Sequence, residues 1–327
     1  MAASIDELLG GASDRQRMLT ADSKSGARFE RVWIDGESYV LKYLHVDDDW
    51  IMRSTGDLGC RPLRVWKSGI LDQLPSTIDH AVVGAASGLG RDGWGAALLM
   101  RDVSASLVPE GDDPVALDQH LTFLDHMADL HATFWGWTDT IGLTPPFHRY
   151  LEFGPDTVSL EARRGWPDAV PPLIVDGWKR FATVGGPVAG QVTALARDPS
   201  PLVDALATVP QTLLHGDWKL GNLGSKPSGQ TVLLDWAVPG QGSPTAELAW
   251  YLALNAARLP HTKEDAIAAY RASLEAHGVA TRAWWDRSLA LSLLGGLVWF
   301  GWEKALGGPG AELSWWLDHS AEGLAHL

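Results

Sequence analysis

The sequence contains very little cysteine and no stretch that resembles a secretion or membrane signal. Cys60 is its single cysteine, so an internal disulfide is impossible. The first residues, MAASIDELLG, carry acids where a signal peptide needs a basic and then an apolar region. The apolar run LALSLLGGLVWFGW, at 289–302, is shorter than the roughly 20 residues of a membrane-spanning helix. We therefore expect a cytoplasmic protein with no membrane partner and a buried helix around 289–302.

Positive charge is also scarce. Lys and Arg total 26 against 40 for Asp and Glu, which gives a net charge of −14 over 327 residues. A negative net charge of this size creates an electrostatic field that repels nucleic acids and anionic membranes and tolerates cationic partners. We therefore expect no nucleic-acid ligand. Hydrophobic residues make up 46% and charged residues 20%, a composition typical of folded globular chains. The length favours two lobes, and the sequence gives no indication of an oligomeric state.

The N-terminal third reads as strands. Residues 15–21 (RQRMLTA), 27–34 (ARFERVWI) and 37–44 (ESYVLKYL) are rich in β-forming residues, and Asp35-Gly36 is a strong tight-hairpin signal. Together they predict an antiparallel meander.

One residue of the third strand is unusual. Alternation places Lys42 on the same face as Val40 and Leu44, between two apolar neighbours. An edge lysine that reaches back to water is one interpretation, and a functional ammonium is the other.

The rest of the chain is predicted to be mostly helical. A buried strand at 94–107 ends a first lobe, residues 1–103, and the second lobe covers 104–327. Asp113 is the expected N-cap of its first helix, with Pro114 at the first helical position. Residues 136–210 are richer in Pro, Gly and Trp and are predicted to form an irregular helical insertion.

The stretch LLHGDWKLGNLG, at 213–224, is the strongest functional signal. It places Asp217 and Asn222 in a loop, and Asp235 follows the apolar strand TVLL shortly afterwards. Phosphoryl transfer from ATP needs a carboxylate near the acceptor hydroxyl and oxygen ligands for Mg²⁺. Asp217, Asn222 and Asp235 supply this carboxylate and these oxygen ligands. Lys42 on the facing lobe supplies an ammonium for the phosphates.

The pattern HGDxxxxN, followed by an Asp after an apolar strand, is similar to the catalytic core of the aminoglycoside phosphotransferases. These are protein-kinase-like small-molecule kinases, with choline kinases among their relatives. The resemblance extends from about residue 15 to about Leu254. It implies an α+β, bilobal fold with an antiparallel-sheet N-lobe and a larger, mainly helical C-lobe. It also implies ATP and Mg²⁺ as cofactors and a hydroxylated small molecule as substrate.

The resemblance assigns roles to individual residues. Asp217 corresponds to the catalytic base, while Asn222 and Asp235 correspond to the magnesium ligands. Lys219 matches a lysine that neutralises the transferred phosphoryl group, and a solvated loop lysine is the alternative. His215 and Gly216 correspond to residues that shape the loop.

Further residues are implied at the nucleotide site. A hinge at about 100–103 would place Met100 near the adenine and the backbone of Arg101 and Val103 at its edge; core packing is the alternative for Met100. The phosphate-covering loop has only Gly26, so it would have to use Ser23, Ser25 and backbone N–H groups.

The usual acidic partner of the strand lysine is absent. No Glu occurs between Glu37 and Glu110, so any partner of Lys42 must be an Asp. Asp57 is the first choice by spacing, and Asp47, Asp48 and Asp49 are the alternatives.

Three classes of protein remain to be distinguished: a small-molecule kinase, a protein kinase and a nucleotide-binding pseudokinase. The segment between Asp235 and Glu247 is too short for the activation segment of a protein kinase. A nucleotide-binding pseudokinase without turnover would be expected to lose one of the key groups, and here all are filled. The sequence therefore favours a small-molecule kinase.

The acceptor is less defined. Tryptophan is abundant, with 17 residues, and two pairs lie beside acids, Trp284-Trp285-Asp286 and Trp315-Trp316 with Asp318. With the negative net charge, they favour an aminoglycoside, an amino sugar or another hydroxylated amine, with a neutral sugar as the alternative.

Overall fold

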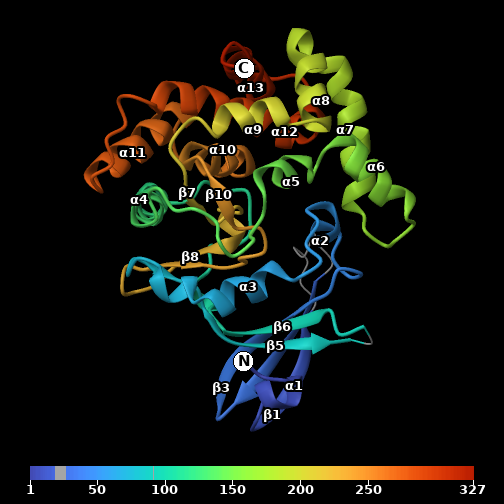
Figure 1. Cartoon of the computed structure of the whole chain (residues 1–327). Coiled ribbons are helices and arrows are strands. Elements are labelled where there is room, and N and C mark those ends of the chain that lie inside the picture. Colours follow the sequence, from blue (N-terminus) through green and yellow to red (C-terminus); the bar gives the residue numbers. More distant parts are fainter. Residues whose placement is uncertain (19–26, 91) are drawn as a thin grey trace.

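The computed structural model describes residues 1–18, 27–90 and 92–327. Ser23, Ser25 and Gly26, predicted to cover the phosphates, lie outside these ranges. Figure 1 shows an antiparallel sheet from the N-terminal third at one end of the molecule and a mass of helices at the other. The expected α+β architecture is confirmed.

The N-terminal sheet has five antiparallel strands in the order β1-β2-β3-β6-β5. They are β1 Ala12–Met18, β2 Arg28–Ile34, β3 Glu37–Leu44, β5 Val82–Leu89 and β6 Gly95–Arg101. Asp35 and Gly36 join β2 to β3 with φ angles of 52° and 86°, the left-handed values that a tight hairpin turn needs. The predicted meander is therefore correct.

Short elements flank this sheet. They are α1 Ile5–Leu8, α2 Trp50–Ser54, α3 Arg61–Ser68, the 3₁₀ turns Ile70–Gln73 and Ser104–Ser106, and the short strand β4 Ile78–Asp79. The two faces of β3 enter different cores: Leu41 packs with Val32 and Leu99, whereas Leu44 belongs to the main core. Lys42 lies on the Leu44 face, which points toward the C-terminal part.

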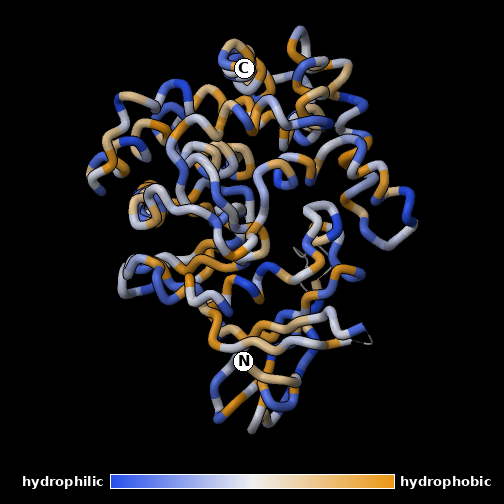
Figure 2. Tube along the Cα trace, viewed as in Figure 1, coloured by the Kyte–Doolittle hydropathy of each residue, from blue (hydrophilic) through white to orange (hydrophobic). Residues whose placement is uncertain are grey.

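The C-terminal part is mainly helical. Its helices are α4 Leu117–Thr133, α5 Pro146–Leu151, α6 Pro155–Arg163, α7 Val170–Val184, α8 Ala189–Arg197, α9 Ser200–Leu206, α10 Pro244–Leu254, α11 Lys263–Ala276, α12 Trp285–Leu306 and α13 Ala311–Leu324. Three-residue 3₁₀ turns lie at Gly186–Val188, Leu220–Asn222 and Ala256–Arg258. In Figure 2 apolar segments concentrate where these helices meet.

Helix α12 is longer than the apolar run that predicted it. It has 22 residues and is long and apolar enough by composition to span a membrane, but 78% of its most apolar window is buried inside the molecule. Its contacts with α7, α10 and α13 make it the central helix of the core, as a buried helix was predicted to be.

The start of α4 corrects one prediction. The helix begins at Leu117 after the N-cap Ala116, and Asp113 and Pro114 precede it as irregular chain. The cause is a contact that is distant in sequence, because Arg258 Nε donates to the Asp113 carbonyl (3.0 Å) and the Arg258 carbonyl accepts from the Val115 N–H (3.1 Å). These bonds hold the segment out of a helical conformation.

Two small sheets lie between the N-terminal sheet and the helices (Figure 1). Strand β7 Thr212–Leu214 pairs with β10 Gly240–Gly242, and β9 Thr231–Leu233 pairs with β4 and with β8 Leu223–Ser225. The HGDWKLGN loop connects β7 to β8, so it lies where the sheet and the helical part face each other.

Candidate active site

A buried carboxylate fixes the start of the loop. The backbone N–H groups of His215 and Gly216 donate to Glu247 of α10 at 3.0 and 2.6 Å. Glu247 is fully enclosed and pairs with His131 of α4 at 2.9 Å. Burial alone would raise the pKa of Glu247, but the hydrogen bond and charge of His131 bring it below its ordinary value. The carboxylate is therefore ionised and holds the two amides in place.

The His215 ring supports the loop without reaching solvent. It is buried and meets Trp236 edge-on at a centroid distance of 4.7 Å. Its Nδ1 accepts from the Asp217 N–H at 3.2 Å, and burial lowers its pKa, so the ring is neutral. A neutral, enclosed imidazole is a structural element, as the sequence predicted for this residue.

The carboxylate of Asp217 is held by three donors. Its Oδ2 accepts from Lys219 Nζ and Asn222 Nδ2, both at 2.8 Å. Its Oδ1 accepts from Trp250 Nε1 of α10 at 3.1 Å. Since each carboxylate oxygen has two lone pairs, Oδ2 is saturated and Oδ1 keeps one lone pair for a proton.

Asn222 and Asp235 are brought together by a strand pair. Leu223 in β8 is opposite Leu233 in β9, and the Leu234 N–H donates to the Asn222 carbonyl at 2.9 Å. Asp235 has a φ of 64°, an uncommon conformation for a residue other than glycine that often marks functional sites. The amide oxygen and carboxylate are hard oxygen donors of the kind that Mg²⁺ prefers, so the residues fit the predicted metal.

Lys42 crosses from the sheet to this cluster. Its Nζ lies 2.6 Å from Asp235 Oδ1, and the lysine side chain is 7% exposed and the aspartate 36%. Burial would raise the pKa of Asp235, but the charge and hydrogen bond of Lys42 lower it below its usual range. Lys42 is therefore an inward-pointing ammonium at the site and not an edge lysine that reaches to water.

The expected partner of Lys42 is a different residue. Asp57 accepts from the backbone N–H groups of Arg61 (2.8 Å) and Gly59 (3.3 Å), and Asp49 caps the start of α2. Asp57 therefore stabilises the turn before α3, and the ion-pair partner of Lys42 is Asp235. Spacing along the chain could not show that Asp235, more distant in sequence than any candidate considered, lies nearer in space.

The predicted hinge residues have mixed surroundings. Met100 is buried at the end of β6 in the main core. The N–H of Arg101 already donates to the Ala81 carbonyl at 2.9 Å, and its guanidinium pairs with Asp79. The Arg101 N–H is therefore not free for an adenine, and the roles of Met100 and Val103 stay predictions.

Sequence reasoning missed three residues that hold the loop around Asp217 or contact its carboxylate. They are Trp250, Glu247 and Arg149, whose guanidinium donates to the Gly216 carbonyl at 2.6 Å and lies 3.8 Å from the Trp250 ring centre. Glu247 offered a signal, because an acid within the apolar helix TAELAWYLAL must find a buried partner. No pattern in the sequence distinguished Trp250 from the other tryptophans.

The tryptophan–acid pairs do not gather at this site. Trp285 and Trp316 are buried in the helical core, and the Asp286 side chain is 95% exposed. Their proximity in sequence to acids reflects helix surfaces and not a common pocket.

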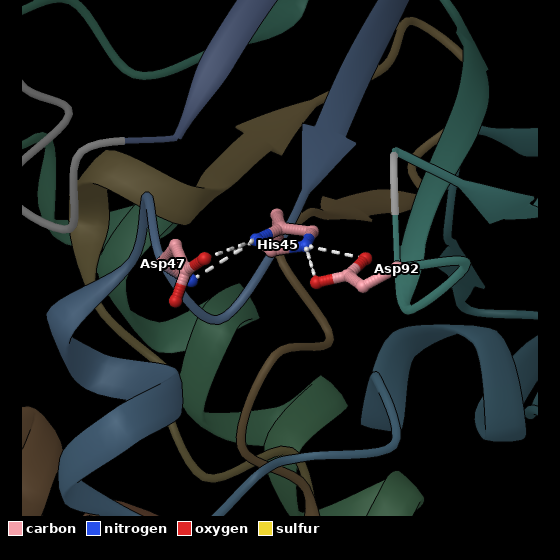
Figure 3. A group of neighbouring side chains, drawn as sticks. All are labelled: His45, Asp47 and Asp92. Carbon is pink, nitrogen blue, oxygen red and sulfur yellow. Dashed lines mark hydrogen bonds and ion pairs between the residues drawn. The ribbon is translucent and has the colours of Figure 1, made fainter.

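A separate cluster of a histidine and two acids lies on the N-terminal part. In Figure 3, Asp47 and Asp92 approach His45 from different sides. Asp92 lies 3.1 Å from Nε2, while Nδ1 accepts from the Asp47 backbone N–H at 3.1 Å. Both ring nitrogens are therefore engaged in hydrogen bonds, which makes the group a tether between the end of β3 and the β5–β6 connection.

Comparisons with known proteins agree with this geometry. The sequence model described as the phosphotransferase enzyme family matches residues 187–285, the segment that holds Asp217, Asn222 and Asp235. A search of curated proteins gave no match.

Solved structures with the same fold span nearly the whole chain. Choline kinase LicA from Streptococcus pneumoniae has a TM-score of 0.54 at 13% identity, over 98% of this chain and 96% of that one. A thermostable mutant of aminoglycoside phosphotransferase APH(4)-Ia with ADP and hygromycin B has 0.50 at 13%, over 98% and 96%. A microcompartment-associated aminopropanol kinase has 0.50 at 17%, over 95% and 91%.

At these identities the structural likeness shows the fold, and the matched segment supplies the sequence pattern. Both confirm the expected resemblance. The chain has the fold of protein-kinase-like small-molecule kinases, and its residues 187–285 match the phosphotransferase enzyme family.

Proposed function

We propose that the protein transfers the γ-phosphate of ATP, with Mg²⁺, to a hydroxyl group of a small molecule. The observation that carries the proposal is the 2.6 Å ion pair of Lys42 with Asp235, which joins residues 193 positions apart. The pair supports the proposal because it brings the strand ammonium to one metal-ligand candidate, while Asn222, the other candidate, donates to the Asp217 carboxylate.

The residues around Asp217 suit the transfer step. The acceptor oxygen attacks the γ-phosphorus, the bond from that phosphorus to the β,γ-bridging oxygen breaks, and ADP leaves with the electron pair. The acceptor proton passes to the free lone pair of Asp217 Oδ1. Lys219 holds Oδ2 and presents a positive charge close to the base.

The cations divide the remaining charge. Asn222 and Asp235 would hold Mg²⁺, which neutralises phosphate oxygens when bound. Lys42 provides a second positive charge for the phosphates, and Ser23, Ser25, Met100 and Val103 complete the predicted nucleotide site. A cytoplasmic location remains a prediction.

ADP release from Mg-ATP, measured against a panel of small alcohols, tests the proposal. We expect acceptor-dependent ADP release that stops on chelation of Mg²⁺ and is lowered about 10²–10⁴-fold in an Asp217→Asn variant prepared identically. Binding of Mg-ADP without turnover on any acceptor would favour a pseudokinase. The net charge of −14 favours an amine-bearing acceptor, with a neutral sugar as the alternative.

A further inference from the structure

Trp250 binds the carboxylate of Asp217 from outside the loop that carries it. Within residues 1–18, 27–90 and 92–327, that carboxylate accepts side-chain hydrogen bonds from three residues. Lys219 and Asn222 belong to the same loop as Asp217 and therefore move with it. Trp250 belongs to α10, and its Nε1 donates to Asp217 Oδ1 at 3.1 Å. Of these three bonds, only the one from Trp250 fixes the carboxylate relative to the helical part.

The Trp250 indole is enclosed by aromatic and charged neighbours. Trp250 is 4% exposed, and the rings of Phe300 and Trp299 lie at centroid distances of 4.7 and 5.2 Å from its ring. The Arg149 guanidinium lies 3.8 Å from the ring centre and is itself paired with Glu152. Burial lowers the pKa of Arg149 from 12.5 to about 10, so the cation is present at neutral pH and holds the ring through a desolvated cation–π contact. The Nε1–H of Trp250 therefore points in a fixed direction.

This fixed donor limits where Asp217 can receive a proton. Lys219 and Asn222 use both lone pairs of Oδ2, and Trp250 uses one of the two on Oδ1. Without the indole donor, Oδ1 would offer two lone pairs, and only contacts within the loop would restrain rotation of the carboxylate. With the donor, a single lone pair is open in one direction. Transfer depends on such alignment, since a misplacement of about 1 Å can reduce turnover about 10²-fold.

We propose that Trp250 is a positioning residue that aims the open lone pair of Asp217 Oδ1 at the acceptor hydroxyl. The proposal rests on the phosphotransferase function proposed above and adds a residue to it. The acceptor proton passes to Oδ1 while the new phosphorus–oxygen bond forms and the bond to the ADP oxygen breaks, and Trp250 Nε1 keeps its own proton throughout. In this role the indole acts only through Asp217.

Indole NMR tests the contact without any turnover. In the isotope-labelled full chain, the Nε1–H resonance of Trp250 is assigned by its loss in a Trp250→Phe variant. We expect Asp217→Asn to move this proton resonance upfield, because a neutral carboxamide is a weaker acceptor than a carboxylate. Trp316 is the matched control, since its Nε1 donates to another carboxylate, Glu312 Oε1, at 2.8 Å within α13. Its resonance should stay in place.

Turnover tests the positioning role. Trp250→Phe removes the N–H donor, and benzothienylalanine at this position, with sulfur in place of the indole N–H, removes it with almost no change of shape. ADP release is measured with kanamycin, glucosamine and glucose, which represent the aminoglycoside, amino-sugar and neutral-sugar classes. We expect both replacements to lower kcat about 10- to 10²-fold and to leave the KM for ATP and the affinity for Mg-ADP unchanged. Trp316→Phe should leave kcat unchanged.

A double-mutant cycle separates orientation of the base from a general structural effect. If the indole acts through Asp217, Trp250→Phe should lower kcat by less than about 2-fold in an Asp217→Asn background, because the base that it orients is absent. A general effect on the loop would lower kcat by the same factor in both backgrounds, and this result would overturn the proposal.

Unchanged or faster turnover after both replacements of Trp250 also overturns the positioning role, as does an indole resonance that Asp217→Asn leaves in place. A raised KM for ATP with unchanged kcat does the same, because it would show a contact that serves the nucleotide. If the wild type binds Mg-ADP but releases no ADP with any acceptor, the phosphotransferase function is refuted. The positioning role then falls with it, even where the indole resonance responds to Asp217→Asn, so the two failures are distinguishable.

Discussion

Replacing Gly216 by alanine should be far more damaging than a glycine-to-alanine change normally is. Gly216 has a φ of +84°, and an added Cβ would lie 2.2 Å from the Val238 carbonyl oxygen. Gly229, in the exposed turn between β8 and β9, is the matched control, because its φ is +89° and nothing lies within 4 Å of its added Cβ. Both variants incur the strain of a side chain at positive φ, roughly 1–2 kcal/mol, so their difference isolates the collision.

The structure sets the size of that difference. To avoid the Val238 oxygen the loop must move by about 1 Å, which disrupts the 2.6 Å bond from the Gly216 N–H to Glu247 and the 2.6 Å bond from Arg149 to the Gly216 carbonyl. Hydrogen bonds to charged groups contribute about 1.5–3 kcal/mol each. We therefore expect Gly216→Ala to be less stable than Gly229→Ala by about 3–5 kcal/mol.

Urea unfolding of the two variants measures this gap, and ADP release shows the functional effect. A displacement of about 1 Å at the base can reduce turnover about 10²-fold, whereas Gly229→Ala should keep wild-type turnover. If the two variants unfold at the same urea concentration and turn over at the same rate, the loop is not held by these contacts and the reasoning is refuted.

Further predictions concern the charged groups. Asp235→Ala should abolish turnover and weaken Mg-ADP binding, whereas Asp217→Asn should lower kcat about 10²–10⁴-fold with nearly intact Mg-ADP affinity; titration calorimetry on both decides, and equal losses of affinity would show that the roles are not divided. Lys42→Ala should keep the fold, shown by circular dichroism, but raise the KM for ATP about 10-fold or more because a charge-assisted contact is lost; unchanged ATP kinetics would contradict the assignment. Burial, with a smaller effect of its neighbour His261, lowers the pKa of His120 from 6.5 to about 4. A depressed histidine pKa gives stability that is present above pH 6.5 and is lost as the pH falls toward 4, so urea unfolding should show a loss of up to about 2 kcal/mol between pH 7 and 5; a His120→Asn variant with the same loss would refute it.

The features that depend on local pattern could be predicted. The strand ESYVLKYL at 37–44 has the predicted bounds because its alternation and the Asp35-Gly36 turn are local. The HGDxxxxN spacing likewise identified Asp217 and Asn222, since the residues that bring them together lie within one loop.

The features that depend on distant contacts could not be predicted. The start of α4 is set by Arg258, which lies 145 residues away from Asp113. The partner of Lys42 and the indole that contacts the base are set by how the sheet packs on the helices. The acceptor could not be specified for the same reason, because net charge describes the whole surface and not the walls of one site.

The ion pair between Lys42 and Asp235 has a consequence for the order of assembly. While the ammonium neutralises the carboxylate, a free divalent cation finds that ligand already occupied by a positive charge. On the proposed function, the phosphates of an arriving nucleotide would offer Lys42 new partners and thereby release Asp235. Metal and nucleotide would then be thermodynamically linked, each raising the affinity of the other by the same factor. We therefore expect the protein to bind the metal ion and the nucleotide as a complex and to have little affinity for the metal ion alone.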